Sequence, residues 1–168
     1  MGRSMLDRRA IVAGLAAVAA SGSVVMSQAE QSRFAAVLVD IGPLQAKGLG
    51  PFADYVRSAL QAELGKAYAD RLGGGRGAPR LVVRIDGISM PAYVGREGGR
   101  SFGGGISNDY LEGEALVVAP NGQILTRHPQ LSALPSNSGG AWYDERSEQR
   151  RVVALAAHYA GWLRRSSL

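Results

Sequence analysis

Hydrophobic positions along the chain follow two spacings, and these predict an alternation of strands and helices. Residues 34–39 form a short continuous apolar run of strand length, which ends before a Gly42-Pro43 break. Residues 51–68 carry apolar side chains at steps of four with polar residues between them, as in a helix with one buried face. Pro51 suits the first turn of such a helix, because its missing N–H would be unpaired there. The pattern therefore predicts a strand followed by an amphipathic helix.

Two further segments alternate between apolar and polar residues, which is typical of strands with one buried face. They are residues 80–90 and 111–119. The alternation places Glu112 and Glu114 on a face that meets Arg84 if the two strands are antiparallel neighbours. We therefore expect these strands to pair, with opposite charges facing each other.

A tight hairpin is the strongest local signal in the second half of the chain. The Asn121-Gly122 dipeptide tolerates the two positive φ angles that a two-residue turn needs. Residues 124–127 then return as a short fourth strand, and a loop rich in Pro, Ser and Gly is expected over residues 129–140. His128 is accordingly expected at the surface, at the end of a strand.

The last segment, residues 144–165, has the charge distribution of a helix. Acidic residues come first, and Arg164 and Arg165 come last, as the helix dipole favours. Its apolar positions predict a buried stripe that consists of Val152, Leu155, Ala156, Tyr159, Trp162 and Leu163.

These elements predict an α+β fold with the order β-α-β-β-β-α. A strand, a helix and a strand in succession favour a parallel pair joined by a right-handed crossover, whereas the two following hairpins are antiparallel. We therefore expect a two-layer sandwich, in which a mixed sheet of about four strands carries two helices on one face. One core should contain Val56, Leu60, Leu64, Val83, Ile85, Val117, Leu155, Tyr159 and Trp162.

The first 29 residues have the composition of an export signal. The pair Arg8-Arg9 precedes an apolar run without charges, and small residues follow where a signal peptidase would cut, after Ala29. The arginine pair resembles the twin-arginine export motif, although general secretion also fits, and an uncleaved membrane anchor is the alternative. We expect residues 1–29 to be removed and residues 30–168 to form one domain, periplasmic or secreted, with no membrane span of its own.

The order of elements after an export signal resembles that of small bacterial envelope domains. It is similar to the amino-terminal domain of TolB and to periplasmic accessory lipoproteins, over roughly residues 34–165. The likeness rests on the element order and on the Asn121-Gly122 hairpin. The chain departs from the lipoproteins because it has no cysteine that could carry a lipid. The resemblance implies an accessory domain that binds another envelope protein.

Charge and composition exclude functions more readily than they suggest one. The formal net charge of +5 falls to about +3 without residues 1–29, and no basic stripe with interleaved rings is present, so nucleic-acid binding is not expected. The chain has no cysteine, which removes disulfides and thiolate metal sites. His128 and His158 are the two histidines and lie far apart in the sequence, so we expect neither a metal nor another cofactor.

A glycine-rich loop at residues 91–108 contains the one motif that suggests catalysis. Ser101 lies in a Gly-x-Ser-x-Gly sequence, and Asp144 and His158 follow in the chain order that many serine hydrolases use. Glycines rather than a helix follow the serine, and the chain is short for such a fold. A small exported hydrolase that uses Ser101 is therefore the alternative function, and we expect no catalytic residue.

Binding through this loop is the function that the sequence favours. Large rings at Tyr93, Phe102 and Tyr110 would supply contact area, and Arg96 and Arg100 would supply directed donors. Alternatively, the two tyrosines only extend the ladder of a hairpin. We therefore expect a non-catalytic accessory or interaction domain of the bacterial cell envelope, with an envelope protein as its partner.

Overall fold

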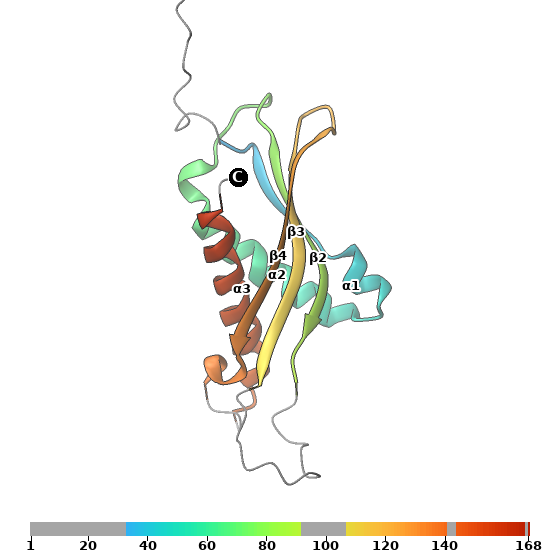
Figure 1. Ribbon diagram of the computed structural model, residues 1–168, viewed down its shortest axis with the longest axis vertical. Helices are drawn as coiled ribbons and strands as arrows, with labels where there is room; N and C mark the ends of the chain where they lie inside the picture. Colours follow the sequence, from blue (N-terminus) through green and yellow to red (C-terminus); the bar gives the residue numbers. More distant parts are fainter. Residues whose placement is uncertain (1–32, 92–106, 141–143, 167) are drawn as a thin grey trace, which may run out of the picture.

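The structure, a computed structural model, describes residues 33–91, 107–140, 144–166 and 168 (Figure 1). No helix within these ranges combines the length and the hydrophobicity needed to cross a bilayer. In chain order the elements are β1 Ala36–Asp40, α1 Gly42–Ala46, α2 Gly50–Ala67, the 3-10 helix η2 Ala69–Arg71, β2 Arg80–Ser89, β3 Asn108–Val118, β4 Ile124–Pro135, the 3-10 helix η3 Ser136–Gly139 and α3 Ser147–Arg165.

The strands form one mixed sheet in the order β1-β2-β3-β4. β1 and β2 are parallel, with Val39 opposite Val83, and the other two pairs are antiparallel. The long helices α2 and α3 pack against each other and cover one face of the sheet (Figure 1). The predicted two-layer α+β sandwich with two long helices on one face is therefore confirmed.

The core lies between the sheet and these two helices, and it contains every predicted core residue except Trp162. Trp162 is 53% exposed. It lies at the margin of the buried stripe of α3, beside the last strand of the sheet, where the described chain offers nothing to cover it. The stripe itself consists of Arg151, Val152, Leu155, Ala156, Tyr159, Ala160 and Leu163.

A short helix, α1, stands where the sequence predicted only a break. Pro43 does not prevent it, because proline is tolerated in the first turn of a helix. Leu44 from α1 is completely buried, and Lys47 Nζ donates a hydrogen bond to the carbonyl oxygen of Asp86 at 2.6 Å. Since β1 ends opposite Arg84, α1 lies alongside the part of β2 that β1 leaves unpaired.

The predicted hairpin between β3 and β4 is present, but its turn differs from the prediction. The N–H of Gly122 donates to the carbonyl oxygen of Ala119 at 2.9 Å, which places Pro120 and Asn121 at the centre of the turn. Gly122 follows with a φ of 87°. This is the geometry of a three-residue connection that ends in a glycine bulge, not of a two-residue turn.

β4 continues to Pro135, whereas the sequence predicted a loop from residue 129 onward. His128 is therefore not at a strand end: it is half-buried within β4, opposite Ala115. Pro129 and Pro135 caused the wrong prediction, because proline has no N–H for a ladder. An edge strand tolerates proline, since one of its sides has no neighbouring strand, and β4 is such a strand.

Candidate functional site

A groove runs between the edge of β4 and the last turns of α3. It is lined by His128, Gln130, Leu131, Trp162, Arg165 and Ser166, and we call these six residues the edge groove. Its volume is about 320 Å³. Leu131 is 65% exposed and Trp162 is 53% exposed. Leu131 stands opposite Glu112, so its side chain lies at the rim of the groove, on the open face of the sheet. The groove thus exposes the large aromatic ring of Trp162 in a concave place with an apolar rim, which is typical of a surface that binds a partner.

Gln130 fixes the strand wall of the edge groove to α3. Its Nε2 donates hydrogen bonds to the carbonyl oxygen of Tyr159 at 2.9 Å and to Ser132 Oγ at 3.3 Å. Tyr159 is fully buried, so this carbonyl belongs to the rigid part of the helix. The separation of the two walls is thus set by a direct bond between them.

Trp162 is held in place although it is exposed. Its Nε1 donates to His158 Nε2 at 3.0 Å, and the two rings meet edge to face with centroids 6.2 Å apart. On the other side, the guanidinium carbon of Arg165 lies 5.0 Å from the centroid of the indole ring, a cation–π geometry. The steps of four and three between these residues, on the flank of the buried stripe, are the sequence signal that could have identified this group.

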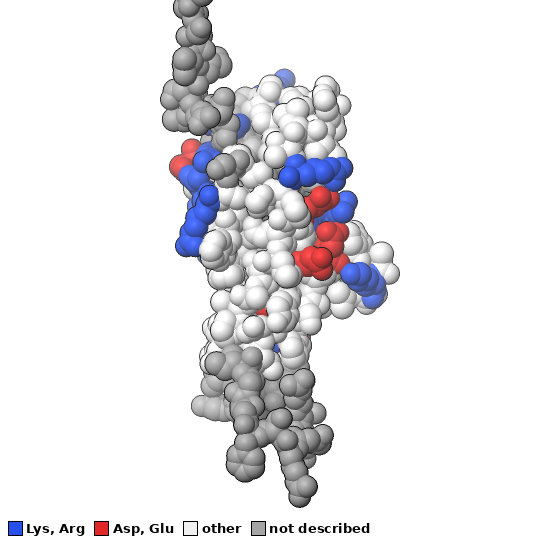
Figure 2. All heavy atoms as spheres, in the orientation of Figure 1, with Lys and Arg blue, Asp and Glu red and all other residues white. Residues whose placement is uncertain are grey.

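The charge in the edge groove is positive. No carboxylate of the described residues lies within ion-pair distance of Arg165. The neighbouring Arg164 is bonded to Asp70 at 2.8 Å. In the orientation of Figure 1, the surface over β4 and α3 is largely uncharged, with basic side chains at its left margin (Figure 2).

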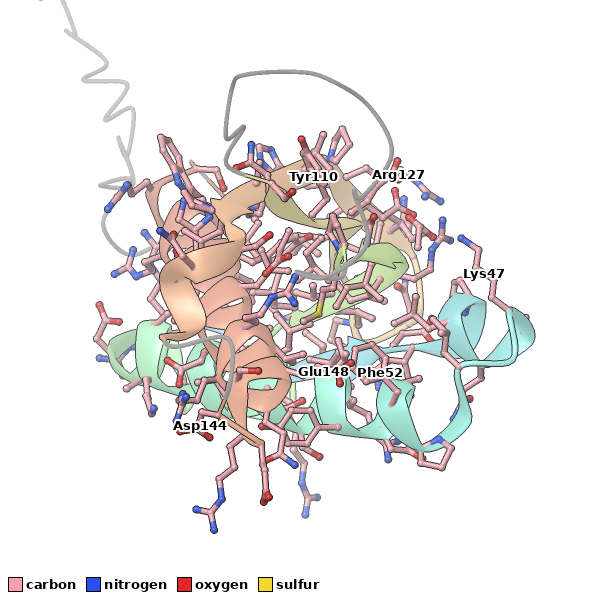
Figure 3. All side chains as sticks on the ribbon, turned by 90° about the horizontal axis from the view of Figure 1, so that it is seen from below. Lys47, Phe52, Tyr110, Arg127, Asp144 and Glu148 are labelled. Atoms are coloured by element: carbon pink, nitrogen blue, oxygen red, sulfur yellow. The ribbon has the colours of Figure 1, made fainter. Side chains whose placement is uncertain are left out.

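Opposite charges gather on the sheet face that the helices leave open. Arg84 and Arg127 both bond to the carboxylate of Glu114, at 3.0 Å and 3.1 Å. The predicted pairing of Arg84 with Glu114 across β2 and β3 is therefore confirmed. Figure 3 shows Arg127 and Tyr110 on this open side, away from Asp144 at the start of α3. Since these ion pairs are partly exposed, each contributes little to stability.

A buried ion pair joins the first turns of α3 to β3. Arg151 Nε donates to Asp109 Oδ2 at 2.9 Å, and its Nη2 makes a second bond to Oδ1 of the same carboxylate. The same Nη2 also donates to the carbonyl oxygen of Pro91 at 2.9 Å, and Ser136 Oγ donates to Asp109 at 2.9 Å. This pair was not predicted from the sequence. The available signal was that Arg151 precedes Leu155 by four residues, so it lies on the buried side of α3.

The predicted binding residues are only partly within the described chain. Tyr93, Arg96, Arg100 and Phe102 lie outside the described residues, as does Ser101. Tyr110 lies in β3, opposite Ser89 of β2 and Ala133 of β4, and is 40% exposed on the open face. Tyr110 thus extends the strand ladder and does not lie in the edge groove.

The acid and the histidine of the hydrolase alternative do not meet. Asp144 precedes α3, and His158 lies about three turns into it, so roughly 15 Å of helix separates them. The backbone N–H of Arg146 and the guanidinium of Arg150 hold the pKa of the Asp144 carboxyl below its ordinary value. His158 has Trp162 as its hydrogen-bond partner. Each residue is engaged by groups other than the one a catalytic triad would require.

Two tyrosine hydroxyls in the core have no hydrogen-bond partner among the described residues, those of Tyr68 and Tyr159. Burial raises the pKa of Tyr68 to about 12. Burial also raises the pKa of Tyr159, and the charges of Asp86 and Glu114 add to the rise. Both hydroxyls therefore stay protonated at neutral pH.

Comparison with known proteins adds no assignment to this geometry. No protein-family model matches the sequence, and no curated protein matches it either. Among the described residues, no group of three or more His, Asp or Glu side chains is placed to hold a metal ion. The edge groove is therefore the feature on which a function can be argued.

Proposed function

We propose that this protein is a non-catalytic accessory domain of the bacterial cell envelope, which binds another envelope protein along the edge of β4. The observation that carries the proposal is the edge groove, in which Trp162 stays exposed although the buried stripe of α3 beside it is covered, and at whose rim Leu131 is exposed as well. Exposed large apolar residues in a concave site cost solubility without a partner, and they supply much of the affinity with one.

The envelope location follows from the export signal expected at residues 1–29. The serine hydrolase with Ser101 is less favoured, because Asp144 and His158 have other partners and lie far apart along α3.

Site-specific photocrosslinking in living cells tests the proposal. A photoreactive amino acid replaces Leu131 in one variant and Val153 in the other. Val153 is a matched control, because it is also an exposed apolar residue but lies in a different hollow, near Tyr55. We expect a protein adduct from position 131 and none from position 153.

Equal adducts from both positions, or none from position 131, would contradict the edge of β4 as the binding surface. The hydrolase alternative is tested separately with a panel of ester substrates. Turnover by the wild type that is lost in Ser101→Ala, with the fold intact, would replace the proposal by an enzymatic function.

A further inference from the structure

We infer that the edge groove takes an extended peptide segment with a carboxylate next to an apolar side chain, and this inference rests on the proposed function. The apolar side chain would pack against Trp162, inside the rim that Leu131 forms. The carboxylate would pair with Arg165. The partner is thus identified by its chemistry, as an acidic, locally extended stretch of a protein chain.

The cation of the groove is available for such a carboxylate. Arg165 lies over the indole ring with its guanidinium, and a stacked guanidinium keeps the N–H groups of its edge free for a planar, bidentate acceptor. Two carboxylates of neighbouring elements are engaged elsewhere, since Asp70 is bonded to Arg164 and Glu114 to Arg127. An anionic ligand therefore meets no competing carboxylate at Arg165 among the described residues.

The aromatic wall is preorganised for an apolar side chain. Trp162 already uses its only donor, Nε1, in the bond to His158, so its exposed surface offers contact rather than a hydrogen bond. Because His158 and Arg165 fix the ring from both sides, binding would cost little side-chain entropy. A space of about 320 Å³ accommodates one or two side chains of a ligand rather than a folded domain.

The shape of the groove favours a peptide over the other occupants. One wall is the edge of a strand, along which an extended chain can lie, and no described residue occupies it. Pro129 and Pro135 deprive this edge of two N–H donors, so contacts of side chains would dominate over strand pairing. A second copy related by a two-fold axis would bring its own Arg165 against the same positive groove. A bilayer is flat and does not fill a concave site.

Selection of peptides on the full chain provides the test. A displayed library of random ten-residue peptides is the probe, and the enriched sequences are then measured as labelled synthetic peptides by fluorescence anisotropy. We expect them to carry Asp or Glu within three positions of an aromatic or aliphatic residue. Their affinity should fall with rising salt, because the ion pair at Arg165 is solvent-accessible.

Four variants locate the binding. Arg165→Glu and Trp162→Ala should each weaken binding by about tenfold or more. Arg57→Glu changes the charge equally on α2, and Tyr110→Ala removes a ring of similar exposure on the open sheet face, so both should bind like the wild type. A peptide with Lys in place of the acidic residue should bind Arg165→Glu better than it binds the wild type.

Four results would overturn the inference. Peptides that need Trp162 but no carboxylate would remove the acidic partner and leave the proposed function standing. Binding that is lost in Tyr110→Ala instead of Trp162→Ala would move the site to the open sheet face. A dimer in light scattering that Trp162→Ala dissolves would make a second copy the occupant. If no peptide is enriched although photocrosslinking at position 131 captures a protein, the proposed function stands and the extended peptide as its ligand is wrong.

Discussion

The two outer strands of the sheet, β1 and β4, differ in how far other parts of the described chain cover them. At the β1 edge, Gln61 Nε2 donates to the carbonyl oxygen of Val37 at 2.7 Å, and α1 takes the place that a longer β1 would occupy. At the β4 edge, no further strand of the described chain pairs with β4, and Leu131 is mostly exposed. An uncovered edge is normally a liability for aggregation, and natural proteins close it or interrupt it.

This difference suggests that the β1 edge contributes to the stability of the fold, whereas the β4 edge is the surface for binding. The β1 side of the sheet carries the bond from Gln61 and the completely buried Leu44 of α1, so changes there should reduce the free energy of unfolding. The β4 edge combines two prolines with exposed apolar residues, which discourages long strand pairing but allows side-chain contacts. Changes there should affect binding and leave stability nearly constant. The following experiments test this separation.

Loss of the buried ion pair should have the largest effect, because it fastens one end of β4 through Ser136. Arg151→Ala would leave the buried carboxylate of Asp109 bonded to Ser136 but without its cation, and we expect a loss of about 3 to 5 kcal/mol in the free energy of unfolding. Denaturant unfolding followed by circular dichroism measures it. The double variant Arg151→Met with Asp109→Leu should recover most of the loss, and a single-variant loss below about 1 kcal/mol would contradict a structural role.

A matched pair of leucines compares the two edges directly. Leu44→Ala, in the helix that closes the β1 side, should cost about 2 to 5 kcal/mol, because Leu44 is completely buried. Leu131→Ala, at the β4 edge, should change stability by less than about 0.5 kcal/mol. Thermal unfolding of both variants measures the contrast. Equal losses would show that the β4 edge also carries part of the core.

The two tyrosines test the core between the edges. Tyr68→Phe and Tyr159→Phe each remove a buried hydroxyl without a partner, so stability at neutral pH should stay equal or rise by up to about 1 kcal/mol. The wild type should lose stability as the pH rises from 10 toward about 12, because the unfolded tyrosine ionises near 10.0 and the folded Tyr68 only near 12. Unfolding curves across this range should be flatter in the variants, and an unchanged slope would rule out both hydroxyls as its cause.

Pro129→Val should have the smallest effect on the folded monomer, within about 0.5 kcal/mol, and should still change its behaviour in solution. It restores an N–H on the β4 edge, so self-association should increase in light scattering at high concentration. Ala133→Val is the control, because it adds the same β-branched side chain to the same strand without adding a donor. Equal association of both variants would assign the effect to hydrophobicity instead of the edge N–H.

Much of the fold is predictable from the sequence because it depends on spacing alone. The alternation over residues 80–90 and 111–119 places Arg84 opposite Glu114, as the structure has them. The steps of four in α2 identify its buried face, with Val56, Leu60 and Leu64 in the core. Such periods follow from the geometry of one element and need no knowledge of its neighbours.

The spacing of His158, Trp162 and Arg165 could indicate that they form one group, but their exposure was beyond prediction, because it depends on where the sheet ends. The spacing of Trp162 fits the buried stripe of α3, and only the absence of a fifth strand in the described chain, beyond β4, leaves it exposed. Proline at position 129 indicates a loop unless the strand is known to be an edge. Asp109 and Arg151 are distant in sequence, so neither residue reveals the other. In each case the sequence pattern shows the element but not which strand or side chain lies next to it in the folded structure.

The bond from Arg151 to the carbonyl oxygen of Pro91 suggests that the domain could carry an inserted foreign sequence. Arg151 also holds Asp109, and the N–H of Ser136 donates to the carbonyl oxygen of Ser107, so the chain is anchored where it leaves at Pro91 and where it re-enters. Arg151 of α3 holds the first attachment point, and Ser136 of η3 holds the second. Foreign sequences grafted there would start with their ends already fixed, and doubling the insert length would cost only about 0.6 kcal/mol. The domain is thus suited to serve as a display scaffold.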